Sequence, residues 1–296
     1  MNMALTGGRR MVISDFIALM KPRIIVLLLI TAYCAMVVAA GKLPSLALTA
    51  ATLAGLGLST GGAHAVNMWY DQDIDRVMRR TRNRPVAAGR MRGETALAFG
   101  IVTEAVSFGL LGWTVNWMAA AWSLAGFLFY VFVYTIWLKR RTPQNIVIGG
   151  AAGAFPPLVG WAAVTGQVSL AALIMFLIIF LWTPPHFWAL ALYKQEDYRS
   201  AGIPMMPVAR GPQVTKWQSL GYSVALLGVS LLLYWTHVVT ADYLVAAAVL
   251  GVAFIGYNLR SLLERAPQLA WAKKTFRFSL VYMALLFTAM VLTIPR

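Results

Sequence analysis

Asn67, Asp71 and Asp75 form a row of oxygen-bearing side chains in which each residue follows the last by four positions. At that spacing on a helix, the three side chains lie on one face. Mg²⁺ prefers oxygen ligands, usually one or two carboxylates together with substrate phosphates and water. Arginines follow directly in the sequence, and a guanidinium group binds phosphate oxygens with a planar fork. The row therefore predicts half of a site for a magnesium diphosphate.

The arginines allow two other interpretations. A helix end held by ion pairs between the aspartates and Arg76, Arg79 and Arg80 would explain the charges, but not the amide in the same row. Basic residues at a membrane surface also contact lipid phosphates, which is their commoner role. Arg23 and Lys139 lie at the ends of apolar runs, as the acidic row does, and are therefore favoured for substrate. The whole basic set is Arg23, Arg76, Arg79, Arg80, Arg84, Lys139 and Arg140.

A second acidic site and two histidines are further candidates. Glu196 and Asp197 follow a later apolar run, where they could hold a second ion, close the first site, or form a solvated helix end. His186 comes after a double proline inside that run, and prolines kink a helix. His186 could carry a proton, bind a metal or haem iron, or simply pack. His64 shares the face of the acidic row and is predicted to face the same cavity.

The composition indicates a helical integral membrane protein. Of the 296 residues, 60% are hydrophobic and only 12% are charged, with a mean hydropathy of +0.70, whereas soluble domains carry about 25% charged residues. A net charge of +15 would suggest nucleic acid in a soluble protein. Here the basic residues lie between apolar runs, so we expect no nucleic-acid partner. The single cysteine, Cys34, excludes a disulfide within the chain and a Cys-based metal site.

Nine apolar runs are long enough to cross a bilayer, which takes about 20 residues each. With nine spans, every basic residue except Lys42 and Arg296 falls on one side of the membrane. The positive-inside rule then places the N-terminus in the cytoplasm and the C-terminus outside. We expect one all-α domain over residues 1–296, in which residues 1–14 form a flexible cytoplasmic N-terminus. The predicted spans are 24–41, 45–67, 95–112, 117–138, 146–164, 168–190, 217–237, 241–259 and 276–294.

These features together resemble the UbiA superfamily of intramembrane prenyltransferases, which combines nine spans, an Asn-x3-Asp-x3-Asp row after the second span and an acidic cluster after the sixth. Several stretches resemble more narrowly the branch that transfers a farnesyl group to haem b. They include YTIWLKRRT at 134–142, NIVIGGAAGAFPP at 145–157 and WTPPHFW at 182–188. The likeness extends from about residue 15 to about residue 290.

The resemblance implies roles for the candidate residues. The metal ligands would be Asn67, Asp71, Asp75, Glu196 and Asp197. The second acidic motif of the superfamily is often Asp-x3-Asp, whereas here its two acids are adjacent. The diphosphate would be held by Arg23, Lys139 and Arg140, to which we add Arg76, the residue directly after Asp75. The predicted catalytic residues are Asn67, Asp71, Asp75, Asp197 and His186, and His64 and His186 would handle haem or a proton.

The resemblance also implies a reaction and a setting. Farnesyl diphosphate and haem b would be the substrates and Mg²⁺ the cofactor, with addition of water at the 2-vinyl group of haem. The protein would lie among the lipids of the bacterial cytoplasmic membrane with its site facing the cytoplasm, and a haem A synthase or oxidase assembly protein would be a partner. One alternative is a different prenyl acceptor, such as a quinone-ring precursor or chlorophyllide. The other is a transporter or haem-handling assembly protein that uses the carboxylates as cation sites.

Overall fold

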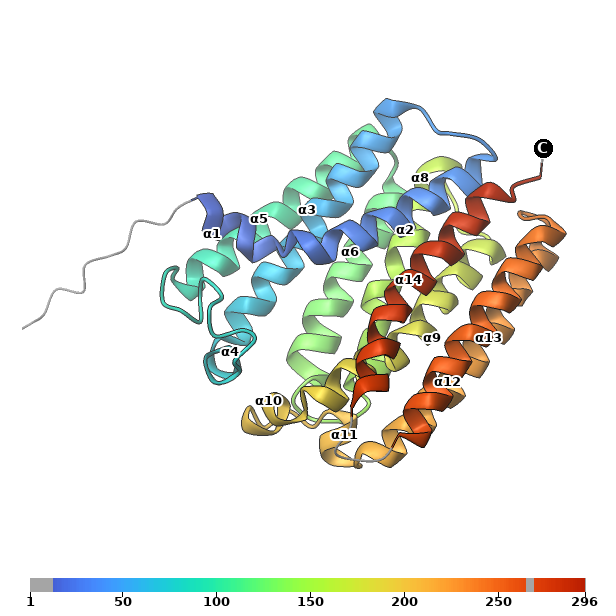
Figure 1. Ribbon diagram of the computed structural model, residues 1–296. Helices are drawn as coiled ribbons and strands as arrows, with labels where there is room; N and C mark the ends of the chain where they lie inside the picture. Colours follow the sequence, from blue (N-terminus) through green and yellow to red (C-terminus); the bar gives the residue numbers. More distant parts are fainter. Residues whose placement is uncertain (1–12, 265–268, 296) are drawn as a thin grey trace, which may run out of the picture.

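The protein, described here by a computed structural model over residues 13–264 and 269–295, is built from helices, and no strand occurs in those ranges. Nine helical segments of the described ranges are long and apolar enough to cross a membrane, and Figure 1 shows them packed in one bundle. They are α2 (Pro22–Ala40), α3 (Leu46–Tyr70), α5 (Gly93–Thr114), α6 with η1 (Trp117–Leu138), α7 with η2 and α8 (Asn145–Thr165), α9 (Leu170–Tyr193), α12 with η3 (Pro212–Thr236), α13 (Ala241–Leu263) and α14 (Ala270–Leu292).

The prediction of an all-helical, nine-span bundle is confirmed, since each predicted run overlaps one of these segments. The largest differences are at α12 and α14, which begin several residues before their apolar runs because polar first turns remain helical. A proline at the first helical position of α12 favours that early start. The predicted flexible N-terminus lies mostly outside the described residues, and α1 (Ile13–Met20) begins within its last part.

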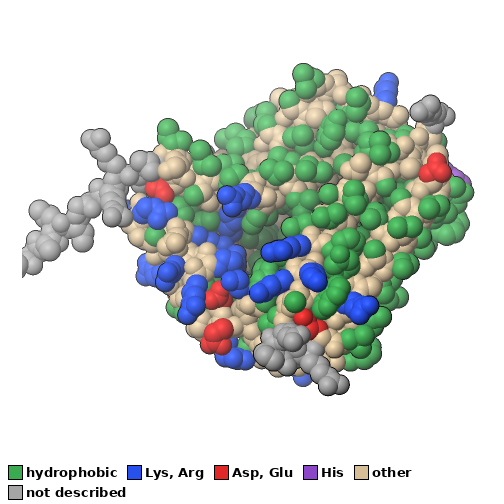
Figure 2. Space-filling view, in the orientation of Figure 1, with side chains coloured by type: hydrophobic (Ala, Val, Ile, Leu, Met, Phe, Trp, Pro, Cys, Tyr) green, Lys and Arg blue, Asp and Glu red, His purple; other side chains and the backbone are tan. Residues whose placement is uncertain are grey.

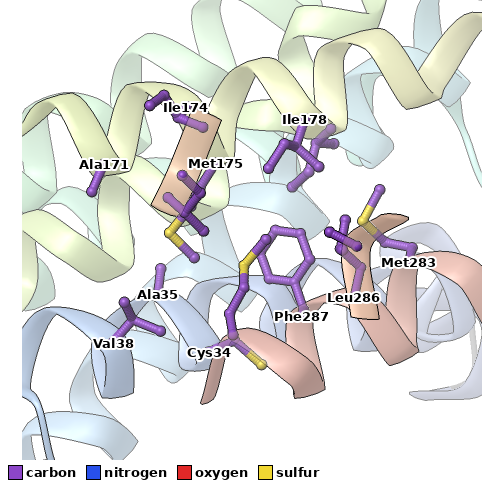
Figure 3. Close-up of a cluster of buried hydrophobic side chains, with 14 of the residues drawn as sticks. Cys34, Ala35, Val38, Ala171, Ile174, Met175, Ile178, Met283, Leu286 and Phe287 are labelled. Carbon is purple, nitrogen blue, oxygen red and sulfur yellow. The ribbon is translucent and has the colours of Figure 1, made fainter. Parts of the chain in front are cut away.

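The helices pack against one another around a shared core. Helix α2 packs on α8, and α3 packs on α5, while α9 contacts both α12 and α14, with α13 between them. A cluster of buried side chains from α2, α9 and α14 fills the centre, and Figure 3 shows Met175 and Phe287 among its members. Small residues bring some backbones close together: a methyl group on Gly160 would meet the carbonyl oxygen of Ala32 at 2.2 Å. Such small-residue contacts are typical of membrane helices.

Two of the spans that line the cavity contain irregular backbone, and a third carries prolines inside its helix. The C-terminal part of the fourth span is a π-helix, η1 (Phe129–Leu138). In the fifth span, the 3-10 helix η2 (Gly150–Ala154) joins α7 (Asn145–Gly149) to α8 (Phe155–Thr165). Helix α9 contains two prolines in its interior. Irregular backbone within a membrane is tolerated where it is buried in protein or lines a cavity. All three segments contribute side chains to the same cavity.

The short helices gather at one end of the bundle, which we call the basic end. Helix α4 (Gln72–Val77) follows α3, while α10 (Gln195–Ser200) and α11 (Met206–Ala209) lie in the connection from α9 to α12. Figure 1 shows these three helices at the same end. The connection from α3 to α5 and the connection from α9 to α12 therefore lie at the same end of the bundle.

Candidate active site

A cavity of about 490 Å³ lies between the spans, and the charged residues of its lining lie at the basic end. Its walls come from α2, α3, α6 with η1, α7 to α8, α9 and α14, and at the basic end from α4, α10 and the loops that follow them. Helices α5, α12 and α13 contribute none of its lining. Figure 2 shows a hollow bordered by Lys and Arg side chains. The polar and ionisable residues of the lining include Lys21, Arg23, His64, Asn67, Asp75, Arg80, Arg84, Tyr130, Tyr134, Lys139, His186 and Tyr198.

The predicted acidic row is buried at this end. Helix α3 ends at Tyr70 and α4 begins at Gln72, with Asp71 between them. The amide of Asp71 still donates to Asn67 O, and that of Asp75 donates to Asp71 O, each at 2.9 Å. The helical register of the row is therefore kept across the break. All three side chains are buried, with exposed fractions of 2% at Asn67, 0% at Asp71 and 2% at Asp75.

Asp71 is held by partners from two distant parts of the chain. Its Oδ2 accepts from the Asn67 side-chain amide at 2.6 Å and forms an ion pair with Lys139 Nζ. Its Oδ1 has no hydrogen-bond partner among the described residues, and Arg140 Nη2 lies 3.5 Å away. Asp71 itself is not part of the cavity lining, whereas Asn67 and Asp75 are. A fully buried carboxylate oxygen without a hydrogen bond is costly, so the Oδ1 of Asp71 is suited to accept a cation.

Asp75 and Asp73 have different environments. Arg84 Nη1 donates to both carboxylate oxygens of Asp75, at 2.9 and 2.7 Å. Asp73 is exposed and pairs with Arg140, with both N–O distances at 2.7 Å. The Arg140 guanidinium lowers the pKa of Asp73 below its usual value. Arg140 therefore lies outside the cavity wall and bridges Asp73 to Asp71.

Lys21 connects α1 to the acidic row. It adopts left-handed backbone angles (φ 55°, ψ 60°) at the start of α2, a conformation that is strained for a residue other than glycine. Its ammonium group donates to Asn67 Oδ1 at 3.2 Å. Burial, together with the positive charges of Arg84 and Lys139, lowers the pKa of Lys21 well below its usual range. The bend thus delivers a further amino group to a cavity that is already rich in positive charge.

The other predicted charged residues are not all at the cavity. Arg23 and Lys139 line it, but Arg76 is exposed and does not. Glu196 is exposed and pairs with Arg199 at 3.1 Å, and neither it nor Asp197 lines the cavity. Within the described ranges, no group of three or more His, Cys, Asp or Glu side chains is placed to hold a metal ion. The metal roles of Glu196 and Asp197 therefore stay predictions, as does the diphosphate role of Arg76.

Both predicted histidines line the cavity, and neighbouring oxygens fix their orientation. His186 stacks between Trp182 and Phe276, with ring centroids 4.2 and 4.7 Å away, and its Nδ1 lies 2.6 Å from Ser279 Oγ. The Ser279 hydroxyl donates to Phe276 O at 2.7 Å, so the network assigns the hydrogen to Nδ1 of His186. His64 Nδ1 likewise faces the carbonyl oxygen of Met20 at 2.9 Å. In each ring, Nε2 is then left with a free lone pair.

Comparison with known proteins identifies the family. Residues 28–281 match the family described as the UbiA prenyltransferase family. The chain belongs to the UbiA prenyltransferase family. It is 58% identical to the protoheme IX farnesyltransferase of Symbiobacterium thermophilum, over 96% of this chain and 95% of that protein. It is 47% identical to the protoheme IX farnesyltransferase of Acidiphilium cryptum, over 94% of this chain and 90% of that protein. The resemblance predicted from the motifs is confirmed.

Solved UbiA-type structures share the fold. A structure of digeranylgeranylglyceryl phosphate synthase matches with a TM-score of 0.78 at 18% identity, covering 95% of this chain and 97% of that chain. A UbiA homologue from Archaeoglobus fulgidus, bound to DMAPP and Mg²⁺, matches with a TM-score of 0.66 at 17% identity, covering 93% and 99%. At these identities, the likeness establishes the fold alone.

Several cavity residues of this UbiA protein were not predicted from its sequence. Lys21 was not among the predicted residues, and Arg84 was not separated from the other arginines. Tyr130 and Tyr134 face the cavity from the π-helix, and Tyr198 reaches it from α10. A lysine directly before a proline at a span end was an available signal for Lys21, because the proline fixes the start of the helix.

Proposed function

We propose that the chain transfers the farnesyl group of farnesyl diphosphate to the 2-vinyl group of haem b, with addition of water, giving haem O and diphosphate. The observation that carries this proposal is the 58% identity to a protoheme IX farnesyltransferase over nearly the whole of both chains. The site supports the same conclusion, because buried oxygens and cations meet at the mouth of a cavity in the membrane.

The acidic row fits a divalent cation. The unpartnered Oδ1 of Asp71 lies in the row with the Asp75 carboxylate and the Asn67 amide, and carboxylate and amide oxygens are suited to Mg²⁺. We therefore assign Asn67, Asp71 and Asp75 as its ligands, and the related Archaeoglobus fulgidus protein was solved with Mg²⁺. When bound, Mg²⁺ neutralises the negative charge that develops on the leaving diphosphate. Glu196 and Asp197 remain the proposed ligands of a second ion.

The surrounding cations are the proposed diphosphate ligands. Arg23, Arg84 and Lys139 line the cavity beside the row, and Lys21 adds a donor at its edge. Fixed positive charges stabilise a leaving group most strongly where water is excluded. Breaking the allylic C–O bond leaves its electron pair on the diphosphate and produces a farnesyl cation, so these residues act on the charge as it forms.

The apolar part of the cavity wall is proposed to surround the farnesyl chain. Beyond the basic end, the cavity is lined by side chains such as Leu28, Leu56, Phe127 and Phe155. They exclude water from the farnesyl cation, so the terminal carbon of the haem vinyl group can attack it and form the new C–C bond. Excluding water in this way prevents hydrolysis of a reactive intermediate.

His186 is the proposed contact to haem. Its ring is fixed by stacking on both faces and by Ser279 at Nδ1. Histidines that bind metals commonly donate their other N–H to a neighbouring oxygen in this manner. We assign Nε2 of His186 to the haem iron, which would position the vinyl group.

The proposed location is the cytoplasmic membrane of a bacterium, with the basic end in the cytoplasm. Nine apolar spans make the chain an integral membrane protein. The distribution of basic residues between the spans favours this orientation. Anionic diphosphate would then enter from the side that carries the positive charge. A haem A synthase or oxidase assembly protein remains a proposed partner.

The test uses purified protein, labelled farnesyl diphosphate and Mg²⁺, with haem b or a quinone-ring precursor as acceptor. We expect haem O and diphosphate with haem b only, and no release after chelation of Mg²⁺. Prenylation of the quinone precursor instead would identify a different acceptor. Haem binding without release of diphosphate would support a haem-handling role and contradict the proposal.

A further inference from the structure

A buried carboxyl group on α5 lies behind the cavity wall. Glu104 is 6% exposed, and neither of its carboxyl oxygens has a hydrogen-bond partner among the described residues. Helix α5 contributes nothing to the cavity lining, so the proposed donor and acceptor sites do not use this residue. An ionisable group inside a membrane is costly and usually functional.

The packing of α5 on α3 places Glu104 beside Ser59. Ser107 Oγ donates to Gly55 O at 2.7 Å, and a methyl group on Gly62 would meet the Glu104 amide nitrogen at 3.5 Å. Ser59 lies on α3 between these two contacts, on the face that packs against the turn of α5 carrying Glu104. The Ser59 hydroxyl is directed to Ser123 O, at 3.5 Å, and both Glu104 oxygens are left without a partner.

Ser123 on α6 completes a polar group at the junction of three helices. Its hydroxyl has no partner among the described residues, although the residue is only 3% exposed. Ser59 and Ser123 both line the cavity. The nearby lining hydroxyls of Thr31 and Thr60 differ, because each donates to a carbonyl of its own helix. Glu104, Ser59 and Ser123 therefore form a polar cluster at the junction of α3, α5 and α6, and the two serines of this cluster belong to the cavity wall.

Such a group is suited to one water molecule. A buried water usually makes two to four hydrogen bonds to polar atoms that lack partners. Both Glu104 oxygens and Ser123 Oγ lack partners, and Ser59 provides a further hydroxyl. The position is also appropriate, because Ser59 lies eight residues before Asn67 on α3, about 12 Å deeper along the helix. A water held there is kept apart from the site of C–O cleavage.

We propose that Glu104, Ser59 and Ser123 hold the water that is added to the acceptor, and that the Glu104 carboxylate takes its proton. This inference rests on the proposed function. After the C–C bond has formed, the positive charge lies on the former vinyl carbon beside the porphyrin ring. The water oxygen forms a bond to that carbon, its proton passes to Glu104, and the resulting carboxylic acid later returns the proton to solvent.

The test measures how the intermediate divides between two products. Without an oriented water and base, the cation loses a proton from the neighbouring carbon and gives an alkene that is lighter than haem O by one water. We expect Glu104→Gln and Ser123→Ala to make this alkene the main product. Diphosphate release should stay within about three-fold of wild type, because C–O cleavage precedes the step. Ser107→Ala, at the same helix contact but outside the cavity, should give haem O only.

The contrary outcomes are distinct. Haem O as the main product of Glu104→Gln would overturn the proposal. An equal loss of diphosphate release and of both products in this variant would also overturn it, because it would indicate a structural role for Glu104. Alkene formation in His64→Gln but not in Glu104→Gln would identify His64 as the base instead. If the wild type itself released no diphosphate with haem b, the proposed function would fail, and this inference with it.

Discussion

Arg84 Nη1 donates to both carboxylate oxygens of Asp75, nine residues earlier in the chain, at 2.9 and 2.7 Å. Asp75 is 2% exposed, so its charge is largely removed from water and needs a partner. The same arginine lines the cavity. Arg84 is thus placed both to hold the acidic row and to bind a diphosphate.

Arg84 is therefore expected to matter more than Arg76. We predict that Arg84→Ala lowers kcat/KM for farnesyl diphosphate by about 100-fold, as for removal of one electrostatic donor. Arg84→Lys should recover part of this loss, because lysine keeps the charge but lacks the planar fork. Arg76→Ala is the control, since Arg76 is exposed and away from the cavity. Steady-state kinetics, with thermal stability measured in parallel, checks the prediction. An equal loss of kcat/KM in Arg76→Ala would instead support Arg76 as a diphosphate ligand, as predicted from the sequence.

The aspartates of the row provide a second matched comparison. Asp71→Asn should reduce diphosphate release by about 100-fold or more, because it removes a buried charge at the leaving group. Asp73→Asn should have a much smaller effect, since Asp73 is exposed and lies two residues further along. Diphosphate release in membranes with equal amounts of each variant checks the difference. Near-normal release by Asp71→Asn would remove the metal assignment.

The proposed haem contact predicts a spectroscopic change. Haem b added to the purified protein should give the absorption spectrum of a histidine-bound iron, and His186→Ala should abolish it. Ser279→Ala should weaken haem binding by about ten-fold, because it frees Nδ1 and loosens the ring. His237→Ala serves as the control, since His237 is exposed at the opposite end of the bundle. An unchanged spectrum in His186→Ala would contradict iron ligation and leave proton transfer for this residue.

The contact between α2 and α8 predicts a stability effect. Gly160→Ala places a methyl group 2.2 Å from the carbonyl oxygen of Ala32, and backbone cannot move aside easily. We predict a loss of about 1–3 kcal/mol, as for an overpacked core. Gly228→Ala in α12, where no atom lies within 4 Å of the new methyl group, should be neutral or slightly stabilising. Thermal unfolding in detergent measures both, and equal stability of the two variants would show that the helices separate without cost.

The sequence by itself determined the spans and the register of the acidic row. Apolar length is a local property, and a bilayer converts it directly into helices. The four-residue spacing of Asn67, Asp71 and Asp75 is also local, and hydrogen bonds from turn to turn preserve it through the break at Asp71. The family motifs are likewise continuous stretches of sequence.

Only the tertiary structure decided which charged groups meet. Lys139 is 68 residues from Asp71, and Lys21 is 46 residues from Asn67, so no spacing rule connects them. The seven arginines between 76 and 92 look alike in sequence, but burial and the path of the loop bring Arg84 to Asp75. The sequence alone did not single out Glu104. Its place beside Ser59 and Ser123 depends on the packing of three helices, which is a long-range property of the folded chain.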